Sequence, residues 1–291
     1  MSKARTVVIT GASRGLGLAS SAELYRRGWC VVGAMRSVES GLDQLREATG
    51  ARSDDPRLLG VNLDLIDPES VSAAGKDIVE KVGAPDALVH NAAVASAGFA
   101  EETPATEWTR LFQTNLFGPV ALTNALLPAM RSAGHGRVVV VSSTVAVRGL
   151  PTSSIYSATK AGLERWAESL AAEIAPHGLG VTILMAGTYA TDITGDATPV
   201  FQDLDGPNRS MHPKMEKRGR AAVKVANPPE RFAKSLARSL ERDRGPIVHR
   251  GVGIDAKILR TVGRFTPTAV MHQLVRVGFA QPRFGVLRET R

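Results

Sequence analysis

The sequence is poor in cysteine, with one such residue, Cys30, among 291. A single thiol excludes intrachain disulfides and any zinc site built from several cysteines. The apolar neighbours of Cys30 indicate a core thiol rather than a nucleophile. The six histidines show no ligand spacing such as His-x-x-x-His. The sequence therefore predicts a protein that works without a metal.

Long hydrophobic runs and nucleic-acid signatures are missing as well. The chain has no stretch of 18 apolar residues, and a strand-like segment begins by Arg5, which argues against a transmembrane helix and a signal peptide. No Lys/Arg block is interleaved with aromatic residues, which form 5% of the chain. We therefore expect a cytoplasmic protein with no integral membrane association and no nucleic-acid partner.

The charge is uneven along the chain. Residues 1–205 carry 17 Lys/Arg against 22 Asp/Glu, whereas residues 206–291 carry 19 against 6. The net charge of +8 therefore comes from the C-terminal third. Such a basic region attracts nucleic acid, anionic lipid or an acidic substrate, or it is only a solvated surface.

Apolar, β-branched segments alternate with amphipathic ones over most of the chain. This alternation predicts a parallel sheet covered by helices on both faces, and hence one doubly wound, Rossmann-like α/β domain over residues 1–291. The predicted strands are 5–10, 29–35, 57–65, 86–91, 136–143, 180–186 and 245–250. The predicted helices follow the first strand to about Arg27 and then cover 68–82, 104–131, 154–176, 230–243 and 254–279.

Two segments fall outside this alternation. Residues 190–229 predict a loop that acts as a substrate-binding lid, because ligands of open α/β sheets bind beyond the carboxyl ends of the strands. Residues 252–291 predict a helical C-terminal extension, which either adds to the pocket or only caps the sheet. The apolar residues that would line a flexible pocket are Val200, Phe201, Leu204, Met211 and Met215 in the lid, and Ile258, Leu259, Phe265, Met271, Leu274, Val275 and Phe279 in the tail.

A glycine-rich turn, TGASRGLG at residues 10–17, lies where the first strand becomes the first helix. Glycines at 11, 15 and 17 let the backbone approach a pyrophosphate, which the helix N-terminus favours. The spacing differs from Gly-x-Gly-x-x-Gly. The same stretch contains Gly-x-Ser-x-Gly around Ser13, but the chain lacks the His-Gly-Gly-Gly loop of a hydrolase, which argues against a nucleophilic serine.

The end of the second predicted strand, Gly33-Ala34-Met35-Arg36, contains no carboxylate. Folds that bind NAD usually place an acidic residue there on the ribose 2′-hydroxyl. Arg36 and Arg14 would instead clamp a 2′-phosphate. This pattern favours NADP(H) over NAD(H).

The segment SSIYSATKAG, residues 153–162, places Tyr156 and Lys160 one helical turn apart. A free tyrosine has a pKa of about 10 and is a poor base near neutrality. A cation one turn away favours the phenolate, so the spacing predicts that Lys160 lowers the pKa of Tyr156.

Taken together, these residues resemble the short-chain dehydrogenases/reductases in their compact single-domain form, over about residues 5–192. The motifs that carry the resemblance are Thr10-Gly11-x-x-x-Gly15-x-Gly17, Asp64, His90-Asn91-Ala92-Ala93, Asn115, Ser143 and Tyr156-x-x-x-Lys160. The resemblance implies that Tyr156 transfers a proton while the cofactor moves a hydride. It also implies that Ser143 binds the substrate oxygen, that Lys160 binds the nicotinamide ribose and that Asn115 holds a water linking the lysine to solvent.

The same resemblance implies a set of cofactor-binding residues and two departures from the family pattern. The set comprises Gly11, Ser13, Arg14, Gly15, Leu16, Gly17, Arg36, Asp64, Leu65, Asn91, Ala92, Tyr156, Lys160, Gly187 and Thr191. His90 and Ala93 stand where the family commonly has asparagine and glycine, and we expect His90 to be a packed or solvent-bridged residue. Ala186 replaces a proline before Gly187, which predicts a looser turn at the nicotinamide.

We therefore expect an NADP(H)-dependent oxidoreductase that interconverts a carbonyl and a secondary alcohol on a bulky apolar substrate of steroid, retinoid, polyketide or long-chain type. One alternative is a reductase of 3-oxoacyl thioesters, whose anionic carrier suits the basic C-terminal third. Another is a catalytically silent NADP(H)-binding regulator. The resemblance also implies a homo-oligomer, a dimer or tetramer, built on the helices 104–131 and 154–176.

Overall fold

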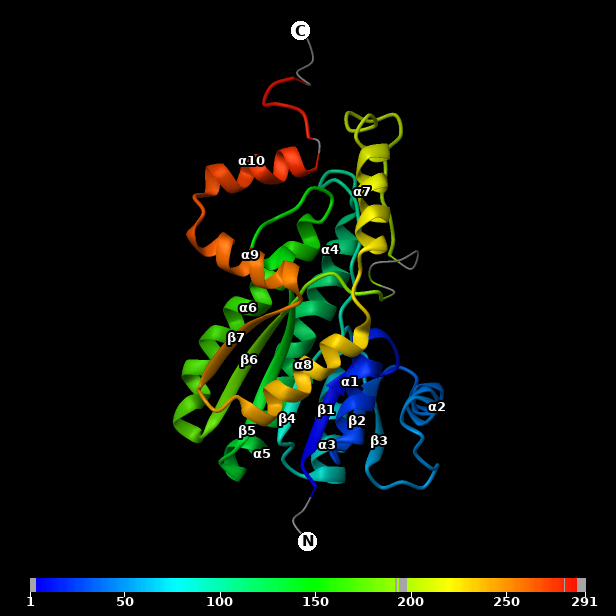
Figure 1. Cartoon of the computed structure of the whole chain (residues 1–291). Coiled ribbons are helices and arrows are strands. Elements are labelled where there is room, and N and C mark those ends of the chain that lie inside the picture. Colours follow the sequence, from blue (N-terminus) through cyan, green and yellow to red (C-terminus); the bar gives the residue numbers. More distant parts are fainter. Residues whose placement is uncertain (1–3, 192, 194–197, 280, 287–291) are drawn as a thin grey trace.

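A seven-stranded parallel sheet in the order β3-β2-β1-β4-β5-β6-β7 forms the centre of the molecule (Figure 1). The computed structural model describes residues 4–191, 193, 198–279 and 281–286. The chain moves outward from β1 to β3 and then returns to the other side of β1, so the switch point of the sheet lies between β1 and β4. The strands are β1 (Thr6–Thr10), β2 (Cys30–Met35), β3 (Leu58–Asn62), β4 (Ala87–His90), β5 (Gly136–Ser143), β6 (Leu179–Ala186) and β7 (Ile247–Val252).

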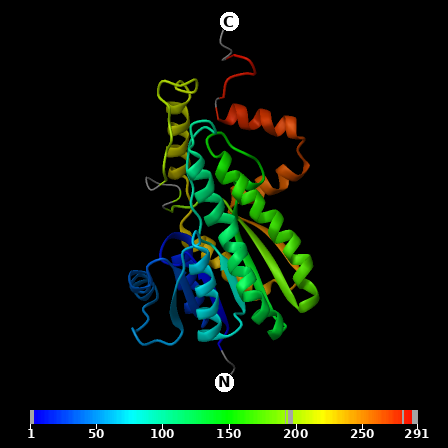
Figure 2. The same ribbon diagram turned by 180° about the vertical axis from the view of Figure 1, so that it is seen from behind.

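Helices cover both faces of the sheet, which confirms the predicted doubly wound α/β fold (Figures 1 and 2). All residues of β1 and β6 are buried, as expected for strands covered on two sides. One face packs against α1 (Gly15–Arg26), α2 (Val38–Thr49) and α8 (Pro229–Arg242). The other packs against α3 (Pro68–Val82), α5 (Gly118–Ala133) and α6 (Ser154–Ile174).

The helical segments differ in detail from those predicted. Helix α2, which ends at Thr49 and is followed by Gly50 in a left-handed conformation (φ 70°), was not predicted. The predicted helix 104–131 consists of α4 (Ala105–Phe112), a π-helical turn (Gln113–Phe117) and α5. The predicted helix 254–279 is divided into α9 (Ile254–Phe265) and α10 (Thr268–Gly278), because Pro267 cannot continue α9.

The predicted lid contains a helix, α7 (His212–Lys224), rather than loop alone. Phe201 N donates to the Ala97 carbonyl at 2.8 Å, which attaches the start of this segment to the loop after β4. Met211 is buried, but Val200 and Leu204 are 60% and 67% exposed, so the prediction that these two face inward is wrong.

Within the described residues, no helix is both long and apolar enough to cross a bilayer. The same part of the chain contains no cluster of three or more His, Cys, Asp or Glu side chains with the arrangement of a metal site.

Candidate active site

Helix α6 places Tyr156 and Lys160 on one face, above the carboxyl end of β5. Lys160 is almost completely buried at 2% exposure. Its Nζ donates a 2.8 Å hydrogen bond to the Val141 carbonyl of β5 and lies 5.8 Å from the centre of the Tyr156 ring. The strand therefore holds the cation below the phenol, which is the arrangement that the spacing predicts.

Ser143 ends β5 beside this pair. Its Oγ accepts a 3.5 Å hydrogen bond from Val145 N at the start of a short 3₁₀ turn, Thr144–Ala146. A hydrogen bond between Ser143 and the Tyr156 hydroxyl acts to lower the pKa of the tyrosine. Ser143 and Tyr156 thus present two hydroxyl groups to the same point, where a substrate oxygen would accept from both.

Burial, rather than the neighbouring charge, dominates the acid–base state of the pair. It raises the pKa of Tyr156 to about 12, against the smaller lowering effect of Ser143. It also lowers the pKa of Lys160 to about 8, although the charge of Glu164 opposes this shift. The prediction that the pKa of Tyr156 is lowered is therefore wrong as a net effect, because burial outweighs any stabilisation of the phenolate by Lys160. Tyr156 keeps its proton at neutral pH and is arranged as a proton donor.

Asn115 lies in the π-helical turn and is fully buried. Its Oδ1 accepts from Val94 N at 2.9 Å, and its Nδ2 donates to Val94 O at 2.8 Å and to Thr159 Oγ1 at 3.1 Å. The side chain thereby joins the loop after β4 to the helix that carries Tyr156. π-Turns inside helices occur frequently at functional sites. The water-holding role of Asn115 stays a prediction.

Two further groups of this site were not identified from the sequence. They are the Val141 carbonyl, which accepts from Lys160, and Thr159, whose Oγ1 also donates to the Tyr156 carbonyl at 2.9 Å. Neither has a sequence signal, because any residue supplies a carbonyl and a helical threonine often bonds its own backbone.

The glycine-rich turn is held in place by the end of β4. Asn91 Nδ2 donates to Thr10 O at 3.0 Å and to Gly11 O at 3.2 Å, and the Thr10 hydroxyl accepts from the backbone N–H groups of Asn91 and Ala92. Gly11 has a φ of 67°, and a Cβ atom on Gly17 would lie 2.1 Å from the Gly11 carbonyl oxygen. The turn therefore requires glycine for steric reasons. Thr10 belongs to this site as a positioning residue.

The N-terminus of α1 fits the pyrophosphate of a dinucleotide. Arg14 occupies the N-cap without a side-chain cap, and the first turn contains no acidic residue. The helix dipole of α1 and the backbone N–H groups of its first turn can therefore bind an anion. Ser13 and Leu16 are half-buried in the same turn. Arg14 and Arg36 are both exposed, and Arg36 directly follows β2.

The remaining predicted cofactor residues lie at the same carboxyl edge of the sheet. Asp64 and Leu65 follow β3, where Asp64 Oδ1 accepts from Ile66 N at 3.1 Å. Thr191 follows β6, and a Cβ atom on Gly15 would lie 3.3 Å from its Cγ2 atom. The turn after β1 and the segment after β6 therefore approach each other across the switch point, and together they fit a nicotinamide dinucleotide.

The turn after β6 is well anchored although it lacks the proline. Gly187 N donates to Val252 O at 2.9 Å, and Thr188 N donates to Asp255 Oδ2 at 2.7 Å. A Cβ atom on Gly187 would lie 2.0 Å from Asp255 Oδ1. The end of β7 and the start of α9 therefore hold this turn without a proline, and the looser turn stays a prediction.

His90 is packed at the end of β4 with 1% exposure. The Thr123 hydroxyl donates to Pro119 O at 2.9 Å, so His90 Nε2, 2.6 Å from Thr123 Oγ1, must donate to it. The Nδ1 atom is buried and has no hydrogen-bond partner among the described residues. Burial, assisted by the charge of Lys160, lowers the pKa of His90 to about 3.

Replacing His90 by asparagine is expected to reduce the loss of stability in acid. Unfolded histidine has a pKa of about 6.5, so below this pH the unfolded state binds more protons than the native state and stability falls towards pH 3. At about 1.4 kcal/mol per pH unit, His90 contributes a loss of about 2 kcal/mol between pH 7.5 and pH 5. Urea unfolding of the wild type and of His90→Asn at pH 7.5 and pH 5 measures this fall in the free energy of unfolding. The exposed His177→Asn is the matched control, and equal losses in wild type and His90→Asn would contradict the assignment.

Both the sequence and the fold of this chain are similar to those of one known protein family. The chain matches the sequence model of the family described as short chain dehydrogenase over residues 5–200. The crystal structure of a short-chain dehydrogenase from Streptomyces avermitilis is 32% identical, with a TM-score of 0.80, covering 97% of this chain and 100% of that one.

Two further relatives are informative about chemistry. The 3-oxoacyl-[acyl-carrier-protein] reductase FabG of Escherichia coli is 33% identical over 190 residues, which are 65% of this chain and 75% of that protein. A metagenomic short-chain oxidoreductase solved in complex with NADP is 25% identical, with a TM-score of 0.67, covering 85% of this chain and 96% of that one.

Proposed function

Because the chain belongs to the short-chain dehydrogenase family, we propose that it is an NADP(H)-dependent oxidoreductase that interconverts a carbonyl and a secondary alcohol. The observation that carries the proposal is the arrangement of Tyr156 above a buried Lys160, with Ser143 beside it. A regulator that only bound the dinucleotide would not need this set of groups.

The nicotinamide cofactor, when bound, supplies or accepts the hydride. The turn at residues 10–17 and the N-terminus of α1 hold its pyrophosphate, and Lys160 binds its ribose. In reduction, Tyr156 Oη donates its proton to the carbonyl oxygen, while Ser143 Oγ donates a hydrogen bond to the same atom. With a pKa of about 8, Lys160 is mostly charged near neutral pH and stabilises the phenolate that remains.

The preference for NADP(H) is supported by the end of β2. Arg36 stands where NAD-binding folds usually carry a carboxylate, and Arg14 lies at the N-cap of α1. Two guanidinium groups match the geometry and charge of a 2′-phosphate. The metagenomic relative solved with NADP agrees with this choice.

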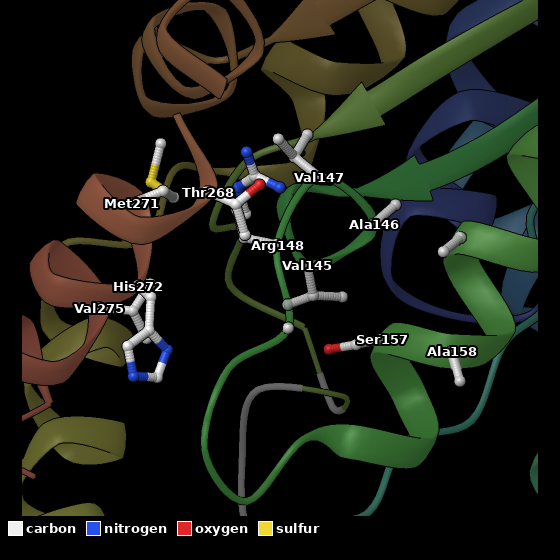
Figure 3. A pocket seen from close by; sticks show the side chains of 12 residues that line it. Val145, Ala146, Val147, Arg148, Ser157, Ala158, Thr268, Met271, His272 and Val275 are labelled. Atoms are coloured by element: carbon white, nitrogen blue, oxygen red, sulfur yellow. The ribbon is translucent and has the colours of Figure 1, made fainter. Parts of the chain in front are cut away.

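A cavity beside the catalytic segment is the candidate binding site for the apolar part of a substrate, although Ser143, Tyr156 and Lys160 themselves do not line it. It has a volume of about 440 Å³ and lies between the loop after Ser143, the first turns of α6, and α10 (Figure 3). This size suits a ligand of drug-like dimensions. Of the seven tail residues predicted to line a pocket, Met271 and Val275 line this cavity. The other five, Ile258, Leu259, Phe265, Leu274 and Phe279, do not, and neither do the five predicted residues of the lid. Its other apolar side chains are Val145, Ala146, Val147, Ala158 and Ala161, and its polar ones include Arg148, Ser157 and His272.

The second candidate function is reduction of a 3-oxoacyl thioester. The similarity to FabG and the basic C-terminal third, with 19 Lys/Arg against 6 Asp/Glu in residues 206–291, favour it. Both candidates use the same catalytic groups, so the substrate decides between them. In either case we propose a homo-oligomer through α4, α5 and α6, where Phe117 is 53% exposed beside these helices.

Catalytic efficiency is expected to rise with the length of an apolar ketone. Each methylene buried in the cavity contributes about 0.8 kcal/mol, so kcat/KM with NADPH should increase along a homologous series until the cavity is filled. Met271→Ala should flatten the rise, because Met271 lines the cavity and is 4% exposed.

The neighbouring Val270→Ala is the matched control, because Val270 is 50% exposed. Equal efficiency on acetone and on ten-carbon ketones would contradict the apolar substrate. A strong preference for 3-oxoacyl thioesters would select the second candidate function. NADPH binding without turnover of any substrate in either series would support the silent regulator.

A further inference from the structure

The C-terminal helices expose an unusual amount of apolar surface. Among the described residues, nine of the sixteen large hydrophobic side chains that are exposed lie within 254–286. They are Ile254, Ile258, Val262, Phe265, Val270, Leu274, Val277, Phe284 and Val286. Contiguous exposed apolar surface of this kind marks a site of interaction.

Seven of these nine side chains form stripes along α9 and α10, and Phe284 and Val286 lie beyond α10. On α9, positions 254, 258, 262 and 265 repeat at intervals of four, four and three, which places them on one face. Ile254 and Phe265 are 77% and 78% exposed, while Ala256 is fully buried on the side that contacts β7. On α10, positions 270, 274 and 277 form a similar stripe, and Met271 points into the body of the protein.

The same segment is mainly basic. Residues 254–286 contain five Lys/Arg and one acidic residue, Asp255. The basic residues are Lys257, Arg260, Arg264, Arg276 and Arg283. By helical spacing, Lys257 lies on one flank of the apolar stripe of α9, and Asp255 lies on the other. Arg260 is turned towards β7, where burial and the charge of Arg260 lower the pKa of His249. An apolar face in a segment with net positive charge is typical of helices that lie in the interface of an anionic membrane.

The position of the helices makes this surface accessible. Both lie beyond the carboxyl ends of the strands, at the end of the molecule opposite the start of β1 (Figures 1 and 2). We propose that α9 and α10 form a peripheral docking surface for a lipid bilayer with anionic headgroups. This docking does not depend on the proposed reaction.

The charge distinguishes a bilayer from a second copy of the chain. In a two-fold symmetric contact each patch meets its own copy, so the excess of five Lys/Arg over one Asp in residues 254–286 would meet the same excess of positive charge. An anionic bilayer supplies both an apolar phase for the stripes and a complementary charge for their flanks. The observations therefore favour the bilayer.

Vesicle flotation with the full-length protein tests the proposal. We expect binding to phosphatidylcholine vesicles that contain phosphatidylglycerol, weak binding to pure phosphatidylcholine, and release at high salt. The double variant Phe265→Glu/Leu274→Glu should lower the partition coefficient by at least about tenfold, because both side chains are exposed and would enter the apolar layer. Lys257→Gln should weaken binding and reduce its salt dependence.

Leu204→Glu is the matched control, because it changes an exposed leucine outside the surface formed by α9 and α10. Circular dichroism checks that each variant is folded. The proposal is wrong if the wild type fails to float with anionic vesicles, or if the glutamate variants bind as well as the wild type. If these variants instead abolish a dimer seen by light scattering and vesicles do not bind, α9 and α10 form an interface between copies of the chain.

Discussion

Tyr156→Phe is expected to lower kcat for carbonyl reduction by about 10²- to 10⁴-fold and to leave the affinity for NADPH nearly unchanged. The substitution removes the hydroxyl that donates the proton and keeps the ring that lies above Lys160. Burial already holds this hydroxyl in its protonated form, with a pKa of about 12. Steady-state kinetics on a confirmed substrate, together with a fluorescence titration of NADPH, separate the two effects.

Two variants make this result specific. Tyr25→Phe removes another tyrosine hydroxyl, one that donates to Asp55 away from the proposed site, and should leave kcat unchanged. Lys160→Ala should reduce both turnover and cofactor binding, because the lysine is assigned to the ribose as well as to the phenol. Near wild-type turnover by Tyr156→Phe would mean that the proton comes from a different group.

Arg36→Ala is expected to weaken NADPH binding by about 10- to 100-fold and to change NADH binding little. Hydrogen bonds between charged groups contribute about 1.5–3 kcal/mol, and Arg36 is the residue after β2 that would contact the 2′-phosphate. NADH lacks this phosphate. Parallel titrations of the two dinucleotides give the ratio of their dissociation constants, which should shift towards NADH.

Arg46→Ala controls for the loss of one positive charge near the site. Arg46 lies on α2, pairs with Asp43 at 2.9 Å and has no assigned contact with the cofactor. It should weaken NADPH binding far less than Arg36→Ala. If Arg36→Ala weakened both dinucleotides equally, or if the wild type preferred NADH, the assignment of the 2′-phosphate would be wrong.

The sheet and the main catalytic spacing were predictable from local patterns. Continuous apolar runs such as 136–143 and 180–186 indicate strands buried on both faces, and they form β5 and β6. A spacing of four residues in a helix is enough to place Lys160 beside Tyr156. The prediction failed at Pro267, where it continued one helix through a residue that cannot extend it. Helix α2 was missed although its sequence is amphipathic.

The sequence by itself determined which chemical groups are present, because glycine turns, strand burial and helical spacing depend on neighbours in the chain. The tertiary structure alone decided their acid–base state and their surroundings. The pKa values of Tyr156 and Lys160 follow from how completely the fold removes water from them, and the turn at Gly187 depends on Asp255, 68 residues away. The apolar stripes of α9 and α10 show the same limit of prediction from the sequence. Periodicity predicts an apolar helix face but not whether another element covers that face.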